Sequence, residues 1–102
     1  PAIGLAAYGS SKAGIEYATE IAAVEYGPKG VRFNCVAAGL IETPMFAGLP
    51  EQAVQSLVQS TVYPARLGQP DEYAKLAEHI CENVLLNGAV LRIDGAIRLG
   101  MK

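Results

Sequence analysis

The chain has 102 residues, of which 51% are hydrophobic and 18% charged, with a net charge of −2 at pH 7. This composition is typical of a globular domain, and the charge provides no basic surface for nucleic acid or an anionic membrane. No apolar run reaches the roughly 18 residues of a membrane-spanning helix. The two cysteines are too few for a disulfide framework and have no metal-ligand spacing, so we expect no metal site and a reducing compartment.

The beginning of the chain indicates that more protein precedes it. The first residue is Pro1 rather than Met, and residues 2–7 are apolar and contain glycine, unlike a solvated terminus. We therefore expect the chain to be the C-terminal part of a longer protein.

Residues 9–26 predict a helix, with Ser10 or Ser11 as the N-cap and Gly27-Pro28 at its end. Small and apolar side chains cover most of this helix, and its charge is confined to Lys12 and three glutamates. A helix of this kind should be covered on two sides. Burial under a sheet and contact of a second face with a partner subunit remain as alternatives.

A predicted strand, residues 31–37, follows a turn, and a helix followed by a turn and a strand is the repeating step of a parallel α/β sheet. Residues 38–49 have no clean periodicity, a short helix runs from Pro50 to about Ser60, and residues 63–68 are irregular. Since ligands of open α/β sheets bind at the carboxyl ends of the strands, this region predicts a lid over a ligand crevice. A plain connection is the alternative.

The last part of the chain predicts another helix and another strand. The helix begins at Pro70, because proline and acidic residues favour the first turn. The strand covers residues 89–93 and ends at the turn Asp94-Gly95. The predicted buried stripe of the helix consists of Tyr73, Leu76, Ala77 and Ile80.

The spacing of Tyr8 and Lys12 suggests acid/base chemistry. Residues four apart on a helix share a face, with Cβ atoms about 5–6 Å apart. A neighbouring ammonium favours the phenolate form of a tyrosine, and a phenolate can exchange a proton with a substrate hydroxyl or carbonyl. Small residues around the pair, such as Gly9 and Ala13, leave room for a ligand.

Five motifs follow one another along the chain: Tyr8-Gly9-Ser10-Ser11-Lys12-Ala13-Gly14, Gly30-Val31-Arg32-Phe33-Asn34-Cys35-Val36, Gly39-Leu40-Ile41-Glu42-Thr43-Pro44-Met45, Arg66-Leu67-Gly68-Gln69-Pro70, and Asn87-Gly88 through Asp94-Gly95. Their order and spacing resemble the short-chain dehydrogenase/reductase family over nearly the whole chain. Within that family, the chain looks most similar to the type II 3-hydroxyacyl-CoA dehydrogenases in four segments: Leu49-Pro50-Glu51, residues 63–68, Asp71-Glu72-Tyr73-Ala74 and residues 86–98.

The resemblance implies the fold. Residues 1–102 would be the C-terminal part of a single doubly wound, parallel-sheet domain of the Rossmann type. The N-terminal dinucleotide-binding half, with its glycine-rich phosphate loop, would precede this chain. We therefore expect no activity from these residues alone.

The resemblance also implies the roles of individual residues. Tyr8 matches the catalytic acid/base, and Lys12 matches the lysine that binds the nicotinamide ribose and assists the tyrosine. Gly39, Ile41 and Thr43 match the loop that touches the nicotinamide, so Tyr8, Lys12 and these three form the expected cofactor-binding set. The family usually has Pro-Gly at Ala38-Gly39, but the glycine is kept and we expect function to survive.

The implied reaction is hydride transfer between a nicotinamide cofactor and a 3-hydroxyacyl or 3-oxoacyl thioester, with NAD expected and NADP as the alternative. Acyl-CoA is the expected substrate, within fatty acid metabolism, and the expected assembly is a homotetramer. The expected compartment is the cytoplasm, or the mitochondrial matrix in a eukaryote. Alternatives are a 3-oxoacyl-carrier-protein reductase, another alcohol or steroid dehydrogenase of the family, and an inactive fragment that serves as an interaction module.

Four further positions have simpler interpretations. His79 lies in the middle of a helix between glutamates and should be solvated. Cys35 and Cys81 are predicted to be core thiols. Arg66 is predicted to form a structural ion pair or turn contact rather than to bind substrate.

Overall fold

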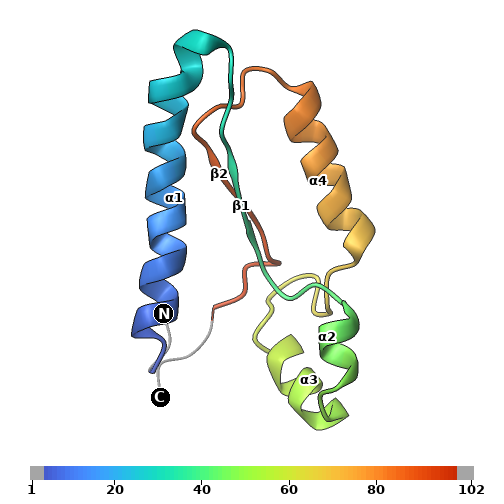
Figure 1. Ribbon diagram of the computed structural model, residues 1–102. Helices are drawn as coiled ribbons and strands as arrows, with labels where there is room; N and C mark the ends of the chain where they lie inside the picture. The colour runs from blue at the N-terminus through green and yellow to red at the C-terminus, as the bar shows by residue number, and fades with distance from the viewer. Residues whose placement is uncertain (1–3, 99–102) are drawn as a thin grey trace.

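A pair of parallel strands, with helices on both of its faces, organises the chain (Figure 1). The computed structural model describes residues 4–98. Helix α1 lies along one face of the strand pair and α4 along the other, while α2 and α3 form a separate lobe near the ends of the strands. This arrangement confirms the predicted α/β class. The elements are α1 (Ala6–Tyr26), η1 (Gly27–Lys29), β1 (Cys35–Ala38), α2 (Pro44–Ala47), α3 (Glu51–Val58), α4 (Pro70–Glu82) and β2 (Val90–Ile93).

Strand β1 is shorter than the predicted strand 31–37. Its pairing with β2 begins at Cys35↔Val90 and ends at Ala38↔Ile93. The preceding residues are extended but bond to the loop before β2 instead. The Phe33 amide donates to Asn87 Oδ1 at 3.0 Å, and the Asn34 side chain donates to the Leu86 carbonyl at 2.9 Å. The partner strand thus sets where the ladder begins.

The side chain of Arg32 holds the C-terminal end of α4. Its guanidinium donates to the carbonyl oxygens of Ile80 at 2.9 Å, Cys81 at 3.1 Å, Asn83 at 3.3 Å and Leu86 at 2.9 Å. The last carbonyls of a helix lack partners within the helix, and a cation there also complements the helix dipole. One side chain therefore fastens α4 to the chain that leads into β1.

Helix α1 begins earlier than predicted, and the predicted cap is wrong. The helix starts at Ala6, its N-cap is Leu5, and no side chain caps it. Ser10 and Ser11 lie inside the helix, where the Ser11 hydroxyl donates to the Tyr8 carbonyl at 2.7 Å. A serine hydroxyl can make such a local bond within a helix as readily as it caps one, so its presence does not locate the N-terminus.

The α2–α3 lobe contains one helix that the pattern did not reveal. Helix α2 is a single turn with Pro44 at its start, too short to generate a periodic pattern. Helix α3 agrees with the predicted short helix, and Val54, Leu57 and Val58 are its less exposed residues. In α4, Leu76, Ala77 and Ile80 form the half-buried stripe, whereas Tyr73 is exposed.

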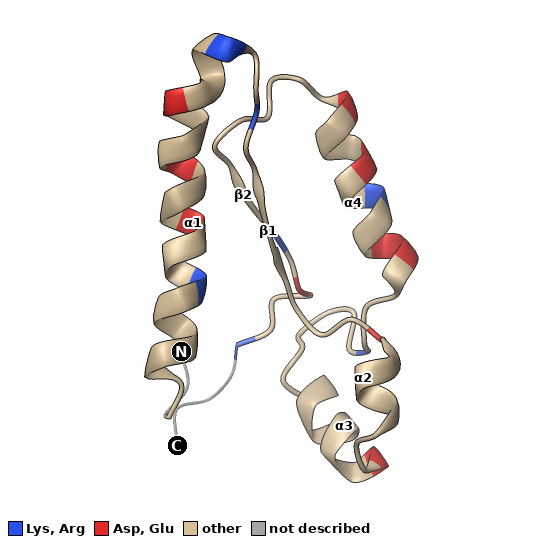
Figure 2. Cartoon of the chain, in the orientation of Figure 1, with Lys and Arg blue, Asp and Glu red and all other residues tan. Residues whose placement is uncertain are grey.

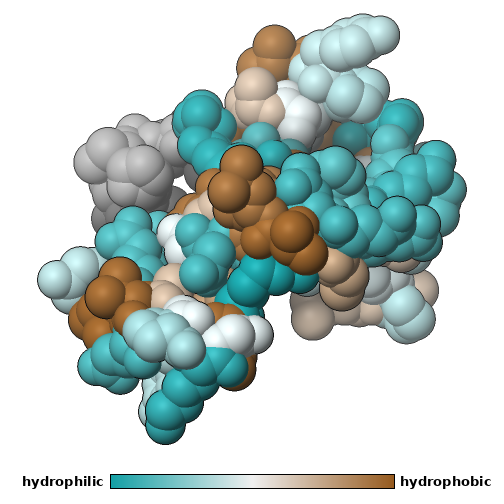
Figure 3. Space-filling view, turned by 90° about the horizontal axis from the view of Figure 1, so that it is seen from above, coloured by the Kyte–Doolittle hydropathy of each residue, from teal (hydrophilic) through white to brown (hydrophobic). Residues whose placement is uncertain are grey.

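Much of the apolar surface of the described residues faces solvent (Figure 3). Ala23 is the only buried hydrophobic residue in this part of the chain, and on α1 Tyr17 is 66% and Val24 78% exposed. The described chain therefore covers one side of α1, and the second cover that the composition predicts does not come from these residues. Among the described helices, none combines the length and hydropathy needed to cross a membrane.

The two cysteines differ in their surroundings. Cys35 is half-buried in β1, whereas Cys81 is exposed, so the prediction of a core thiol is wrong for Cys81. Its neighbour Ile80 occupies the inner stripe of α4, and one residue further along a helix turns the side chain away from that stripe. Residues 4–98 contain no His, Cys, Asp and Glu grouping suited to a metal ion.

We predict that Arg32→Met destabilises the protein by about 2 kcal/mol, because several bonds from a charged donor are lost and helix carbonyls lose their partners. Urea unfolding followed by circular dichroism would measure the change. Lys29→Met is the matched control, because Lys29 lies on the surface near the Tyr26 ring and should change stability by no more than about 0.5 kcal/mol. Equal stabilities of the two variants would contradict the role of Arg32 in holding the end of α4.

Candidate active site

Helix α1 brings Tyr8 and Lys12 together on one face, one turn apart. The Lys12 ammonium lies 5.3 Å from the centre of the Tyr8 ring, within the range of a cation–π contact. Tyr8 is 60% exposed, and both residues lie in the first turns of the helix. Acidic residues predominate further along α1, so Lys12 is the positive charge nearest the phenol on this helix (Figure 2). The structure thus juxtaposes the two groups that the spacing predicts.

A hollow of about 1080 Å³ opens beside this pair, between the start of α1 and the strands. Tyr8 and Lys12 line it from the helix, Ala37 and Ala38 from β1, and Val90 and Arg92 from β2. It extends to the residues that follow β2, where Asp94 and Arg98 also line it. The hollow therefore reaches the carboxyl ends of the parallel strands, where open α/β sheets bind ligands.

Asp94 organises charge at the end of β2. Its carboxylate accepts hydrogen bonds from Arg92 Nε at 3.1 Å and from the Ala96 amide at 3.0 Å, and Arg98 Nη1 lies 3.7 Å away. Partial burial opposes the charged form, but the bonds from Arg92 and Ala96 and the two nearby cations outweigh it and lower the pKa of Asp94. The predicted Asp94-Gly95 turn is confirmed, and it carries a fixed negative charge.

The position of Gly39 leaves no room for a side chain. A Cβ at residue 39 would lie 2.6 Å from Asp94 Cβ and 2.7 Å from Asp94 Cα. The Gly39 amide also donates to the Ile93 carbonyl at 3.0 Å. Close backbone approach therefore requires this glycine, which the family motif places in the cofactor loop. Ala38, in place of the usual proline, ends β1 beside it.

The structure separates the remaining predicted loop residues from Tyr8. Ile41 lies in an isolated parallel bridge with Gly68, and Thr43 is an exposed residue at the N-cap of α2. Neither lines the large hollow. Tyr8 and Lys12 are thus brought together with Ala38, the neighbour of Gly39, while Ile41 and Thr43 lie further along the same loop.

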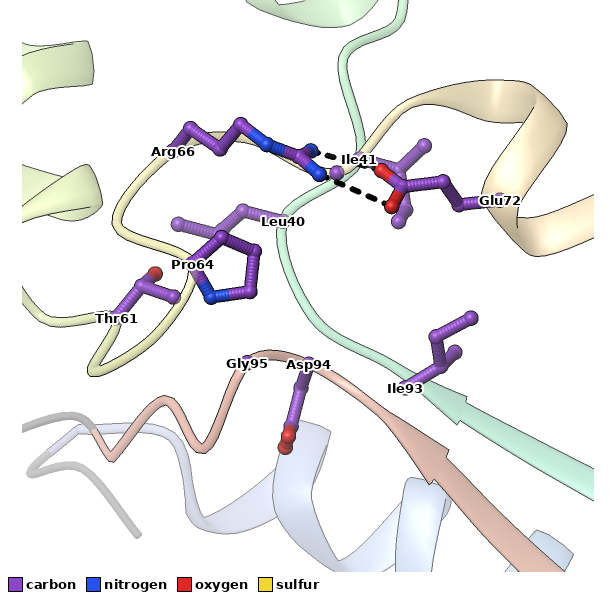
Figure 4. Close-up of a pocket in the computed structure, with 10 residues that line it drawn as sticks. Leu40, Ile41, Thr61, Pro64, Arg66, Glu72, Ile93, Asp94 and Gly95 are labelled. Atoms are coloured by element: carbon purple, nitrogen blue, oxygen red, sulfur yellow. Dashed lines mark hydrogen bonds and ion pairs between the residues drawn. The ribbon is translucent and has the colours of Figure 1, made fainter.

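A smaller cavity of about 110 Å³ lies under that loop (Figure 4). Leu40, Ile41 and Pro64 provide apolar walls, and Arg66 and Glu72 face each other across one side. The Arg66 guanidinium donates to both Glu72 oxygens, at 2.8 and 3.0 Å. This two-bond ion pair confirms the structural interpretation of Arg66.

Glu72 also accepts a hydrogen bond from the Gln69 amide at 2.8 Å. The bond from Arg66 and then the bond from Gln69 lower the pKa of Glu72 from 4.5 to about 2. The sequence marks Glu72 only as an acidic residue at the start of a helix and does not indicate its pairing with Arg66. The available signal for Glu72 was its place in the first turn of a helix, three positions after the N-cap residue Gln69.

His79 agrees with the prediction of a solvated histidine. It is exposed near the end of α4, and its Nε2 lies 3.3 Å from the Asn83 side-chain nitrogen. The residues that sequence reasoning missed are instead polar groups in and beside the strands. Arg32 and Asn34 bond to α4 and to the loop before β2, and Arg92 holds Asp94. Charged and amide side chains within a β-rich run were the available signal.

Comparisons with known proteins define the class. The family model described as enoyl-(acyl carrier protein) reductase matches residues 2–97. Over 97 residues, the chain is 48% identical to a 3-hydroxyacyl-CoA dehydrogenase type-2 of Drosophila melanogaster, covering 95% of this chain and 38% of that protein. The protein of the same name from Homo sapiens is 45% identical, with 95% and 37% covered.

Solved structures agree with the sequence comparison. The crystal structure of 3-hydroxyacyl-CoA dehydrogenase type-2 from Mycobacterium avium has a TM-score of 0.88 at 38% identity, covering 94% of this chain and 37% of that one. A 3-oxoacyl-[acyl-carrier protein] reductase from Brucella melitensis has a TM-score of 0.82 at 34% identity, covering 91% and 35%.

The chain belongs to the short-chain dehydrogenase/reductase family, and its fold is part of the Rossmann-type fold of that family. Within the family, its sequence is similar to 3-hydroxyacyl-CoA dehydrogenases type-2 from several animals. The chain spans 38% and 37% of the length of the fruit-fly and human relatives.

The Arg66–Glu72 pair should make stability depend on pH in the acid range. Because the pKa of Glu72 is lowered from 4.5 to about 2 in the folded state, its stabilising contribution is complete above 4.5 and is lost as the pH falls toward 2. Glu72→Gln should reduce the fall in Tm over this window, measured by circular dichroism at several pH values. Glu78→Gln, an exposed carboxylate on the same helix, is the control and should keep the parent slope.

Gly39→Ala should destabilise the protein by about 1–3 kcal/mol, because the added methyl group would overlap the Asp94 backbone. Urea unfolding would measure the loss. Gly48→Ala is the control, because a Cβ there meets nothing within 4 Å. A Gly39→Ala variant as stable as Gly48→Ala would show that the close approach to Asp94 is absent.

Proposed function

We propose that the complete protein is a nicotinamide-dependent oxidoreductase in which Tyr8 is the acid/base. The observation that carries the proposal is the Tyr8–Lys12 pair beside a hollow at the carboxyl ends of the parallel strands. Membership of the short-chain dehydrogenase/reductase family supports the same reaction class. A bound nicotinamide cofactor would supply the hydride chemistry.

Tyr8 would move the proton. Its phenol is exposed to the hollow, so a substrate oxygen can approach it without rearrangement of α1. In oxidation, the phenolate accepts the hydroxyl proton as the carbon loses its hydride. In reduction, the phenol returns that proton to the carbonyl oxygen. The rest of the reacting surface must come from groups that face Tyr8 across the hollow.

Lys12 would assist in two ways. Its ammonium lies near the Tyr8 ring, where it would favour negative charge that develops on the phenol oxygen during proton transfer. It also lines the hollow, where its N–H groups can donate to the hydroxyls of a bound ribose. Both roles need the lysine side chain to remain next to Tyr8, as the helix places it.

The loop 39–43 would form the nicotinamide side of the site. Gly39 lets the backbone pass close to Asp94, and this places the start of the loop beside the end of β1. The Thr43 hydroxyl lies at the start of α2, exposed and free to approach a ligand. A cofactor that enters between α1 and the strand ends would have to extend beyond the hollow to reach Ile41 and Thr43.

We infer that the substrate is a 3-hydroxyacyl or 3-oxoacyl thioester, with acyl-CoA and NAD the first candidates. The names of the animal relatives and of the mycobacterial structure support this choice. Apolar residues between β1 and α3 suit an acyl chain; they are Leu40, Ile41, Met45, Phe46 and Leu49. The Brucella melitensis structure supports the second candidate, a 3-oxoacyl-carrier-protein reductase, for which NADP would be the alternative cofactor.

These 102 residues contain no glycine-rich phosphate loop, so the proposal concerns the complete protein rather than this chain alone. An inactive interaction module remains the alternative for the isolated chain. The exposed apolar side chains of α1, including Tyr17 and Val24, support subunit contacts in a homotetramer. We propose a cytoplasmic location, or the mitochondrial matrix in a eukaryote, and a place in fatty acid metabolism.

If Tyr8 is the acid/base, Tyr8→Phe in the complete protein should lower kcat by about 10²–10⁴-fold, because the proton relay is lost. Cofactor affinity should change little. Turnover would be measured with 3-hydroxyacyl-CoA and NAD, and in reverse with 3-oxoacyl thioesters of CoA and acyl carrier protein with NADH and NADPH. Fluorescence titration with NADH would measure cofactor affinity.

Tyr73→Phe is the matched control, because Tyr73 is an exposed tyrosine on α4 and does not line the hollow. It should retain parental turnover. A Tyr8→Phe variant with unchanged kcat would remove Tyr8 from the mechanism, whatever the substrate.

A further inference from the structure

We propose that Arg66 and Glu72 are positioning residues for the cofactor-facing loop 39–43. The inference rests on the proposed function, since it assigns a role toward the same cofactor. Neither residue lines the hollow beside Tyr8. They act instead through the segment 66–69, which bonds directly to the loop.

The first step is the backbone connection between this segment and the loop. The Gly68 amide donates to the Leu40 carbonyl at 2.7 Å, and the Glu42 amide donates to the Gly68 carbonyl at 2.8 Å. A Cβ at Gly68 would lie 2.8 Å from Ile41 Cδ1, so the segment 66–69 and the loop 39–43 are in close contact. The position of Ile41 therefore follows the position of residue 68.

A side-chain bond adds a second connection. Gln69 Nε2 donates to Glu42 Oε2 at 3.0 Å. The loop residue before Thr43 is thus held to the residue that precedes α4. Displacement of Gln69 would move Glu42, and with it the start of α2.

Glu72 fixes the segment 66–69 to the first turn of α4. Its carboxylate binds Arg66 through two hydrogen bonds and accepts a third from the Gln69 amide. Arg66 Nη1 also donates to the Leu67 carbonyl at 3.0 Å. Both ends of the four-residue segment therefore meet on one carboxylate, as the paired side chains in Figure 4 show for Arg66.

The other end of the loop does not depend on this pair. Gly39 bonds to the Ile93 carbonyl and lies against Asp94. The Arg66–Glu72 pair, in contrast, is exposed to solvent, with side chains 48% and 38% accessible. Exposed ion pairs add little to global stability. Its contribution to stability, including the part lost at acid pH, should therefore be small, and its main effect should fall on the geometry of residues 40–43.

The test uses Glu72→Gln and Arg66→Lys in the complete protein. Glu72→Gln should raise the Kd and KM for NADH about tenfold, with a much smaller change in kcat, because the loop is misplaced while Tyr8 is untouched. Arg66→Lys keeps the charge but loses the two-bond geometry, so it should give an intermediate rise. The double variant should be no worse than Glu72→Gln alone, since both changes break one unit.

A second readout needs no cofactor. Amide hydrogen exchange of Glu42 and Gly68 should become faster in Glu72→Gln, because their bonds join the loop to the segment. Exchange at Val36 in β1 should not change. Glu78→Gln, on the same helix, should leave both the exchange rates and the Kd for NADH at the parental values.

The inference is overturned if folded Glu72→Gln and Arg66→Lys bind NADH as the parent does and show parental exchange at Glu42. If Glu72→Gln does not fold, Gln69→Ala decides, because it removes the side-chain bond to Glu42 that joins the segment to the loop; an unchanged Kd for NADH then overturns the inference. A parent protein that binds neither NADH nor NADPH refutes the proposed function instead, and unchanged exchange then separately refutes the positioning role.

Discussion

The close approach of two chain segments at the ends of the parallel strands governs the rest of the structure. Gly39 follows β1 and lies against the backbone of Asp94, which follows β2. A side chain at residue 39 would prevent this contact. Because of this contact, the loop after β1 turns over the end of the sheet. The same turn at Asp94 directs the chain toward the hollow beside Tyr8, so this steric constraint bears on the wall of the candidate site that lies opposite α1.

Polar groups attach α4 and the neighbouring loops to this strand pair. Arg32 binds the carbonyls at the end of α4, and Asn34 binds the loop that leads into β2. At the other end of α4, Glu72 binds the segment that contacts the loop 39–43. Helix α4 is therefore fixed at both ends even though its apolar stripe is only half-buried.

The proposed acid/base group and the proposed cofactor surface lie on different elements. Helix α1 holds the proposed acid/base and its lysine, and the strand ends and loop hold the proposed cofactor surface. Tyr8 and Lys12 depend only on helical spacing, so any helix through these residues would pair them. The relation of that pair to Gly39, by contrast, requires α1 to pack against the strands. The proposed acid/base pair is thus local, whereas the candidate site is a tertiary assembly.

The sequence by itself determined the α/β class, the Tyr8–Lys12 pair and the glycine that follows β1, because helical spacing and family motifs are local properties. It did not determine where α1 starts, since a serine can bond within a helix as well as cap it. It also overextended β1, whose limits depend on where β2 pairs. The roles of Arg32 and Glu72 emerged only from the tertiary structure, because their partners lie elsewhere in space and an arginine or glutamate carries no local mark of its partner.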